Sequence, residues 1–77
     1  MAVTAFLFVE CASGRLKDVL GKLKRVGGVR DAHIVTGNYD IIALVEAQDL
    51  RALSDAILSK IQAIQGVYKT TTNVAVE

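Results

Sequence analysis

Apolar residues follow two alternating spacings along the chain, and the changes of spacing divide it into strands and helices. Between Val3 and Cys11 apolar side chains stand on both faces of an extended segment, which predicts a strand covered on both sides. Between Leu16 and Val26 apolar residues recur at helical spacing, with lysine and arginine on the other side. The same reasoning predicts strands at 29–36 and 39–47, a helix at 50–64 and a last strand at 67–76.

Residues typical of element ends stand between these segments. Ser13 and Asp49 precede the two helices, and we expect each to cap its helix with a side-chain oxygen. Gly27-Gly28 and Gly66 follow the helices and supply residues that tolerate positive φ. Gly37-Asn38 predicts a short turn, so the strands on either side of it should run antiparallel.

The order of elements predicts two strand–helix–strand units joined by a hairpin. We expect each right-handed crossover to return its strand beside a parallel neighbour. Two such units give an α+β fold, the ferredoxin-like βαββαβ sandwich, with both helices on one sheet face. The other face would be open and partly apolar, with segment 41–45 deep in the sheet. We therefore expect two copies to pack these faces together as a two-fold dimer, a dimeric αβ-barrel.

Composition adds to this picture. The chain has 77 residues, of which 52% are hydrophobic, so we expect one domain over residues 1–77. A domain of this size buries only about 60–65% of its unfolded surface, and the apolar excess favours a homo-oligomer. A formal net charge of +1 does not favour direct nucleic-acid binding. No apolar run approaches the roughly 20 residues of a membrane span, and no signal-peptide pattern opens the chain. A single cysteine excludes an internal disulfide. We expect a cytoplasmic protein without membrane contact.

Catalytic and metal chemistry has few residues to draw on. Cys11 ends an apolar strand and is interpreted as a packing residue, while His33 is interpreted as a solvated or hydrogen-bonded strand residue. One histidine and one cysteine cannot complete a four-ligand zinc site. Gly27-Gly28 follows a helix, which is the wrong side for phosphate capture. We expect no enzyme activity, no metal and no cofactor.

Two polar clusters interrupt the apolar pattern. The turn Thr36-Gly37-Asn38-Tyr39-Asp40 is either a hairpin with polar flanks or a site whose amides and carboxylate hold the charged groups of an amino acid. Thr70-Thr71-Thr72-Asn73 suits a solvated edge strand. However, Thr70 and Thr72 share a face with Val74 and Val76. On such an apolar face their hydroxyls would need hydrogen-bond partners from a ligand or another subunit. Both interpretations stay open for each cluster.

Taken in order, the turn at 36–40, an apolar strand, a helix, Gly66-Val67 and Thr70-x-Thr72 resemble the effector domain of Lrp/AsnC transcription regulators. The resemblance covers essentially the whole chain. It implies the βαββαβ fold, dimers built sheet to sheet, often four dimers in an octamer, and an amino acid or related effector bound between neighbouring dimers.

The resemblance also implies a residue set for this ligand-binding site. The turn residues would line it, and two threonines would come from an adjoining subunit: Thr36, Gly37, Asn38, Tyr39, Asp40, Thr70 and Thr72. The turn amides would take the effector carboxylate, and Asp40 would take its ammonium or orient the turn.

Full-length members carry a DNA-binding helix-turn-helix before this module, whereas here Met1 leads straight into the first strand. We expect a sensor-only protein that acts alone or co-assembles with full-length regulators. Lys69 stands where the family usually has acidic or polar residues, which would alter effector choice.

Three alternatives remain. An ACT-like module also binds amino acids at subunit interfaces, but its glycine-rich turn is only faintly suggested by Ser13-Gly14. A small dimeric αβ-barrel enzyme would need a pocket lined with His, Trp or Asn, and the chain has one His and no Trp. A purely structural oligomer would share every packing feature and lack ligand binding.

Overall fold

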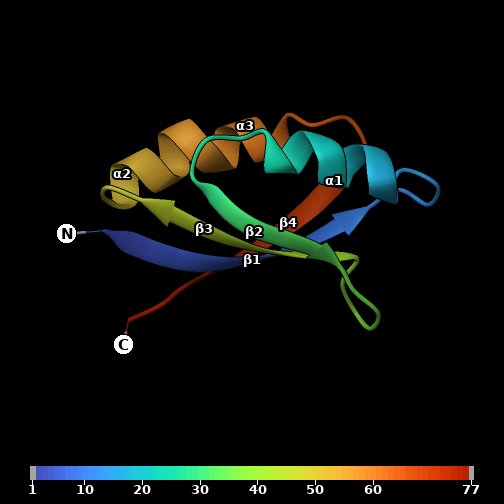
Figure 1. Cartoon of the computed structure of the whole chain (residues 1–77), viewed down its shortest axis with the longest axis horizontal. Helices are drawn as coiled ribbons and strands as arrows, with labels where there is room; N and C mark the ends of the chain where they lie inside the picture. The colour runs from blue at the N-terminus through green and yellow to red at the C-terminus, as the bar shows by residue number, and fades with distance from the viewer. Residues whose placement is uncertain (1, 77) are drawn as a thin grey trace.

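The computed structural model describes residues 2–76, which form one four-stranded sheet with helices on one of its faces (Figure 1). A short π-helical stretch, η1, lies between α2 and α3 and makes 50–62 one continuous helix. The elements in chain order are β1 (Val3–Cys11), α1 (Leu16–Lys24), β2 (Val29–Ile34), β3 (Ile41–Ala47), α2 (Leu50–Ala52), η1 (Leu53–Leu58), α3 (Ser59–Gln62) and β4 (Val67–Val74).

The strands follow the order β2-β3-β1-β4, and every neighbouring pair is antiparallel. This arrangement confirms the predicted α+β, ferredoxin-like βαββαβ fold. The expectation that each crossover returns beside a parallel neighbour is wrong. Strands β1 and β2 run parallel, but β3 lies between them and pairs with both. The two units interleave because the hairpin inserts β3 into the gap that the first crossover leaves.

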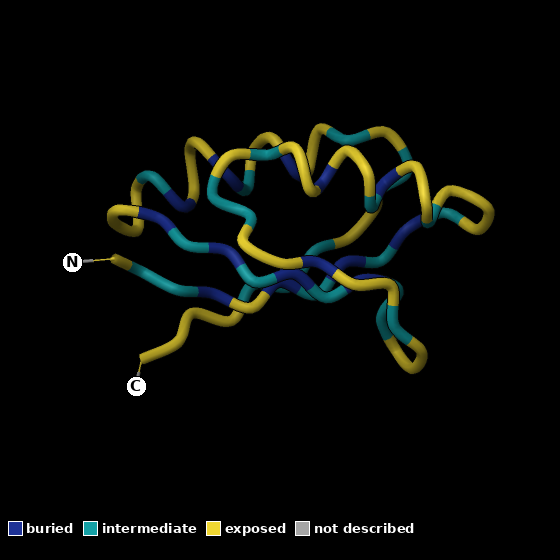
Figure 2. Tube along the Cα trace, viewed as in Figure 1, coloured by how far each residue is buried: buried dark blue, intermediate teal, exposed yellow. Residues whose placement is uncertain are grey.

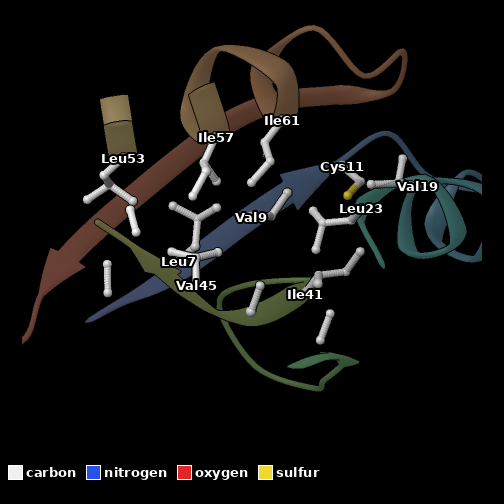
Figure 3. Close-up of a cluster of buried hydrophobic side chains, with 14 residues drawn as sticks. Leu7, Val9, Cys11, Val19, Leu23, Ile41, Val45, Leu53, Ile57 and Ile61 are labelled. Carbon is white, nitrogen blue, oxygen red and sulfur yellow. The ribbon is translucent and has the colours of Figure 1, made fainter. Parts of the chain in front are cut away.

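The hydrophobic core lies between the sheet and the helices (Figures 2 and 3). Strands β1 and β3 are interior, and alternate residues of each, such as Leu7 and Val45, are fully buried against the helices. From the helical layer, Val19, Leu23 and Ile61 are also fully buried. Each side chain of this size contributes roughly 1.5–3 kcal/mol on burial. The apolar pattern of 41–45 therefore correctly placed β3 deep in the sheet.

The opposite sheet face has no covering layer within residues 2–76. It presents the alternate residues Phe6 and Phe8 from β1 and Ile42 and Leu44 from β3, and Phe6 is 46% exposed. These four residues are called the open apolar face below. A patch of this kind on a small domain favours burial against another surface. The sheet-to-sheet dimer stays a prediction.

Element ends depart from the sequence expectations in part. Asp49 caps the second helix, because its Oδ1 accepts the Ala52 N–H at 2.7 Å. Ser13 does not cap the first helix. Instead, the Arg15 N–H donates to the Ala12 carbonyl at 3.1 Å, which closes a turn over Ser13 and delays the helix to Leu16.

The strands β2, β3 and β4 are each two residues shorter than expected, and the first and second helices both end two residues early. Gly28 follows α1 at φ +98°, the conformation expected for a residue that ends a helix. The expected single domain over 1–77 stays a prediction, and its two terminal residues lie outside the described residues.

Candidate functional site

The loop between β2 and β3 holds the first polar cluster. It spans residues 35–40, so it is longer than the two-residue turn that Gly37-Asn38 predicted. The Val35 N–H donates to the Asp40 carbonyl at 2.9 Å and closes the loop, and Gly37 lies at φ +115°. Thr36, Gly37 and Asn38 are exposed at the tip. The loop projects past the sheet on the side away from the helices (Figure 1).

Asp40 fastens the base of this loop to the end of β1. Its Oδ2 accepts the Cys11 N–H at 2.8 Å, and its own N–H donates to the Val9 carbonyl at 3.0 Å. Burial raises the pKa of the Cys11 thiol, and the nearby negative charge of Asp40 raises it further. The carboxylate thus has a structural partner within the chain. This geometry agrees with the expectation that Asp40 orients the turn, while contact with an effector ammonium stays a prediction.

Tyr39 extends the open apolar face toward the loop. Its ring stacks on Phe8, with ring centroids 4.9 Å apart and an angle of 23° between the ring planes. Phe8 points away from the helices, as its neighbours Leu7 and Val9 are buried under them. The Tyr39 ring therefore forms an aromatic wall where the open face meets the loop.

The second cluster lies on the edge strand β4. Thr70 pairs with Val9 and Thr72 with Leu7, so both threonines stand on the helix side of the sheet. The Gln62 Nε2 of α3 donates to the Thr70 Oγ1 at 3.2 Å. Sequence reasoning missed Gln62, since nothing in the helical pattern distinguishes it from other exposed polar residues. An open hollow of about 320 Å³ lies beside this pair.

The two clusters do not meet within one chain. Val9 of β1 pairs with Ile41 of β3 on one side and with Thr70 of β4 on the other, so the loop at 35–40 and the threonines lie at the same end of the sheet. Two strand spacings separate the backbones of Ile41 and Thr70, which is about 10 Å. Tyr39 is on the open face and Thr70 is on the helix face. A single site containing both would need a second subunit to supply one of them, as the resemblance implied. That arrangement stays a prediction.

Cys11 and His33 stand on opposite faces of the sheet. Cys11 is buried toward the helices, as expected for a packing residue. His33 is exposed on β2, where its Nε2 lies 3.0 Å from Asp31 Oδ1. Within residues 2–76 no three side chains of His, Cys, Asp or Glu gather as a metal site would require. The lysines of α1 and Arg25, which follows this helix, are exposed, and Lys22 pairs with Asp18 at 3.3 Å. Among the described helices, none is long and apolar enough to cross a membrane.

Comparison with known proteins identifies relatives of this chain. Residues 4–77 match the family model of the Lrp/AsnC ligand binding domain. The chain belongs to this family. An HTH-type transcriptional regulator of Pyrococcus horikoshii is 33% identical over 72 residues, which cover 94% of this chain and 46% of that protein. The chain therefore spans about half the length of the curated HTH-type regulators that it matches.

Solved structures share the fold of this Lrp/AsnC ligand-binding domain. FFRP-DM1 superimposes with a TM-score of 0.90 and 35% identity, covering 96% of this chain and 99% of that one. A Neisseria meningitidis transcriptional regulator solved as an L-Met complex has a TM-score of 0.85 at 17% identity, covering 97% of this chain and 50% of that one. The second comparison shows the fold alone.

One group of relatives is enzymatic. The homocitrate synthase of Sulfurisphaera tokodaii is 32% identical over 76 residues, which are 97% of this chain but only 16% of the enzyme. The match is thus confined to a small part of that protein. The family as a whole is a regulatory ligand-binding family, which favours the Lrp/AsnC interpretation over an ACT-like module or a small barrel enzyme.

Proposed function

We propose that this chain is an effector-sensing and oligomerisation module that binds a small molecule, an amino acid or a close relative, at the boundary between subunits. The observation that carries the proposal is the match of residues 4–77 to the Lrp/AsnC ligand binding domain. We further propose that the module performs no catalysis and acts in transcription regulation, alone or assembled with a full-length regulator. The Neisseria meningitidis regulator solved with L-Met supports an amino acid as the class of effector.

The loop at 35–40 supplies suitable groups for one half of the proposed site. Gly37 and Asn38 are exposed at the loop tip, where their backbone N–H groups can donate to an effector carboxylate. Tyr39 offers a ring face, held in place by its stacking on Phe8. Asp40 keeps the loop in position through its bonds to β1, so that the amides are preorganised before the effector arrives.

The other half of the proposed site comes from an adjoining subunit through Thr70 and Thr72. This division agrees with the placement of the two clusters on opposite faces of one sheet. The open apolar face, with Phe6 46% exposed, supports the assembly that such a site needs. We propose a sheet-to-sheet dimer as the unit and an octamer of four dimers as the larger assembly.

A thermal-shift screen against the twenty amino acids tests the proposal. An effector at about 100 times its Kd stabilises the folded state by roughly 2.7 kcal/mol. For a domain of this length that corresponds to a rise in Tm of about 10–20 °C. A rise with one or a few amino acids is expected. If none of the twenty shifts the Tm of a well-folded sample, amino-acid sensing is wrong.

A further inference from the structure

The hollow between α3 and β4 is a polar surface that contains Thr70, one residue of the proposed effector site. It has a volume of about 320 Å³ and opens beside the edge strand. The residues that line it are Gln62, Val67, Tyr68, Lys69 and Thr70. Tyr68 stands out because the residue is 69% exposed, which is high for an aromatic residue in a sheet. A volume of this size holds several heavy atoms, since one water occupies about 30 Å³ in the liquid.

The bond between Gln62 and Thr70 fixes how the threonine hydroxyl can be used. A threonine hydroxyl has one hydrogen to donate and two lone pairs to accept with. The Gln62 amide donates to Oγ1 at 3.2 Å and so occupies one lone pair. The hydroxyl hydrogen of Thr70 then remains for a further acceptor. Because hydrogen bonds in series polarise one another, the Gln62 amide also makes this hydroxyl a better donor.

Of the remaining lining residues, Tyr68 offers a donor, its phenolic hydroxyl. Lys69 does not, because it pairs with Glu10 on the open side of the sheet, where its ammonium lies 4.0 Å from Glu10 Oε2. Val67 is the one aliphatic residue of the lining, and none of the lining residues carries a carboxylate. A surface with this balance attracts oxygen acceptors and offers little to a branched apolar group.

We propose that this hollow binds the side chain of the effector and selects amino acids whose side chains end in a carboxylate or carboxamide. The inference rests on the proposed function, in which Thr70 meets the effector from the adjoining subunit. The loop at 35–40 then takes the backbone groups of the effector, and the hollow takes its side-chain oxygen. Gln62 is a positioning residue that acts through Thr70.

The test compares effectors of similar shape on the full chain. Aspartate, asparagine, glutamate and glutamine are titrated against leucine and methionine, which resemble them in size but lack the acceptor oxygen. The same titrations are run on Gln62→Glu, in which the side chain can only accept from Thr70 and carries a negative charge. Gln48→Glu is the matched control, because Gln48 is an exposed glutamine in the turn after β3. Unliganded Tm values check that both variants are folded.

Wild-type protein is expected to bind at least one acceptor-bearing amino acid ten times more tightly than its apolar counterpart. Gln62→Glu is expected to weaken that binding tenfold or more, with the larger loss for the acidic effector, while Gln48→Glu binds as wild type does. Binding of leucine or methionine in preference would overturn the inference and leave the proposed function standing. Equal binding of the effector by Gln62→Glu and Gln48→Glu would show that the hollow is not part of the effector site. If wild-type protein binds none of the twenty amino acids, both proposals fail together.

Discussion

Asp40 is expected to stabilise the folded chain even when no ligand is bound. Its Oδ2 accepts the Cys11 N–H at 2.8 Å, and Cys11 is only 5% exposed. Asp40→Ala removes the acceptor and leaves a buried donor without a partner, which costs about 1–3 kcal/mol. For a domain of 60–100 residues each kcal/mol corresponds to about 4–8 °C, so a mid-range loss of about 2 kcal/mol lowers the Tm by about 8–16 °C.

The comparison between variants isolates the carboxylate. Asp40→Asn keeps an oxygen acceptor of the same shape but loses its charge, so about half of the effect is expected. Asp55→Ala removes an exposed acid from η1 and should change stability by no more than about 0.5 kcal/mol. Thermal unfolding followed by circular dichroism gives the Tm, and hydrogen exchange reports the Cys11 amide directly. An Asp40→Ala protein that melts within 2 °C of wild type, with an equally protected Cys11 amide, would refute this reasoning.

Three further predictions follow from the packing. At Gly28, with φ +98°, an added Cβ would overlap Ile57 Cδ1, so Gly28→Ala should cost about 2–4 kcal/mol. Ile57→Val removes that atom, so in a double-mutant cycle it should restore part of the stability that Gly28→Ala loses. Gly14→Ala is the control: open space surrounds Gly14, so this change should lower stability only through backbone strain. Strict additivity of the Gly28 and Ile57 changes would contradict the contact. Cys11 is buried and its pKa is raised, so less of its thiol is ionised at pH 8 and alkylation by iodoacetamide should be slower than in the unfolded chain. Equal rates would mean that the thiol is accessible. Phe6→Lys should weaken self-association at least tenfold in light scattering while the subunit stays folded, and an unchanged assembly would place the interface elsewhere.

The sequence pattern predicted the elements that depend on local periodicity. Apolar residues on both faces of 41–45 placed β3 deep in the sheet, and β3 is one of its two interior strands. Asp49 was correctly expected to cap the second helix, since the Asx side chain reaches the backbone three residues later without help from the rest of the fold.

Features that depend on contacts between distant segments were not predictable in this way. The loop at 35–40 is longer than its Gly-Asn pair suggests because Asp40 is held by β1, which lies far away in sequence. The first helix starts after Ser13 because a turn from Ala12 to Arg15 precedes it. The pairing of Gln62 with Thr70 requires the docking of α3 on β4, so no local pattern reveals it.

The central claim is that an effector binds where subunits meet, and sedimentation velocity with and without an amino acid tests it most directly. The stabilising amino acid from the thermal screen is added at about 100 times its Kd, and the protein is diluted until it dissociates. Because a ligand shared between subunits binds the assembly better than the free subunit, the dissociation midpoint should fall at least tenfold in protein concentration. An unchanged midpoint, with full occupancy of the dissociated subunit, would show that the effector binds within one chain and would contradict the account.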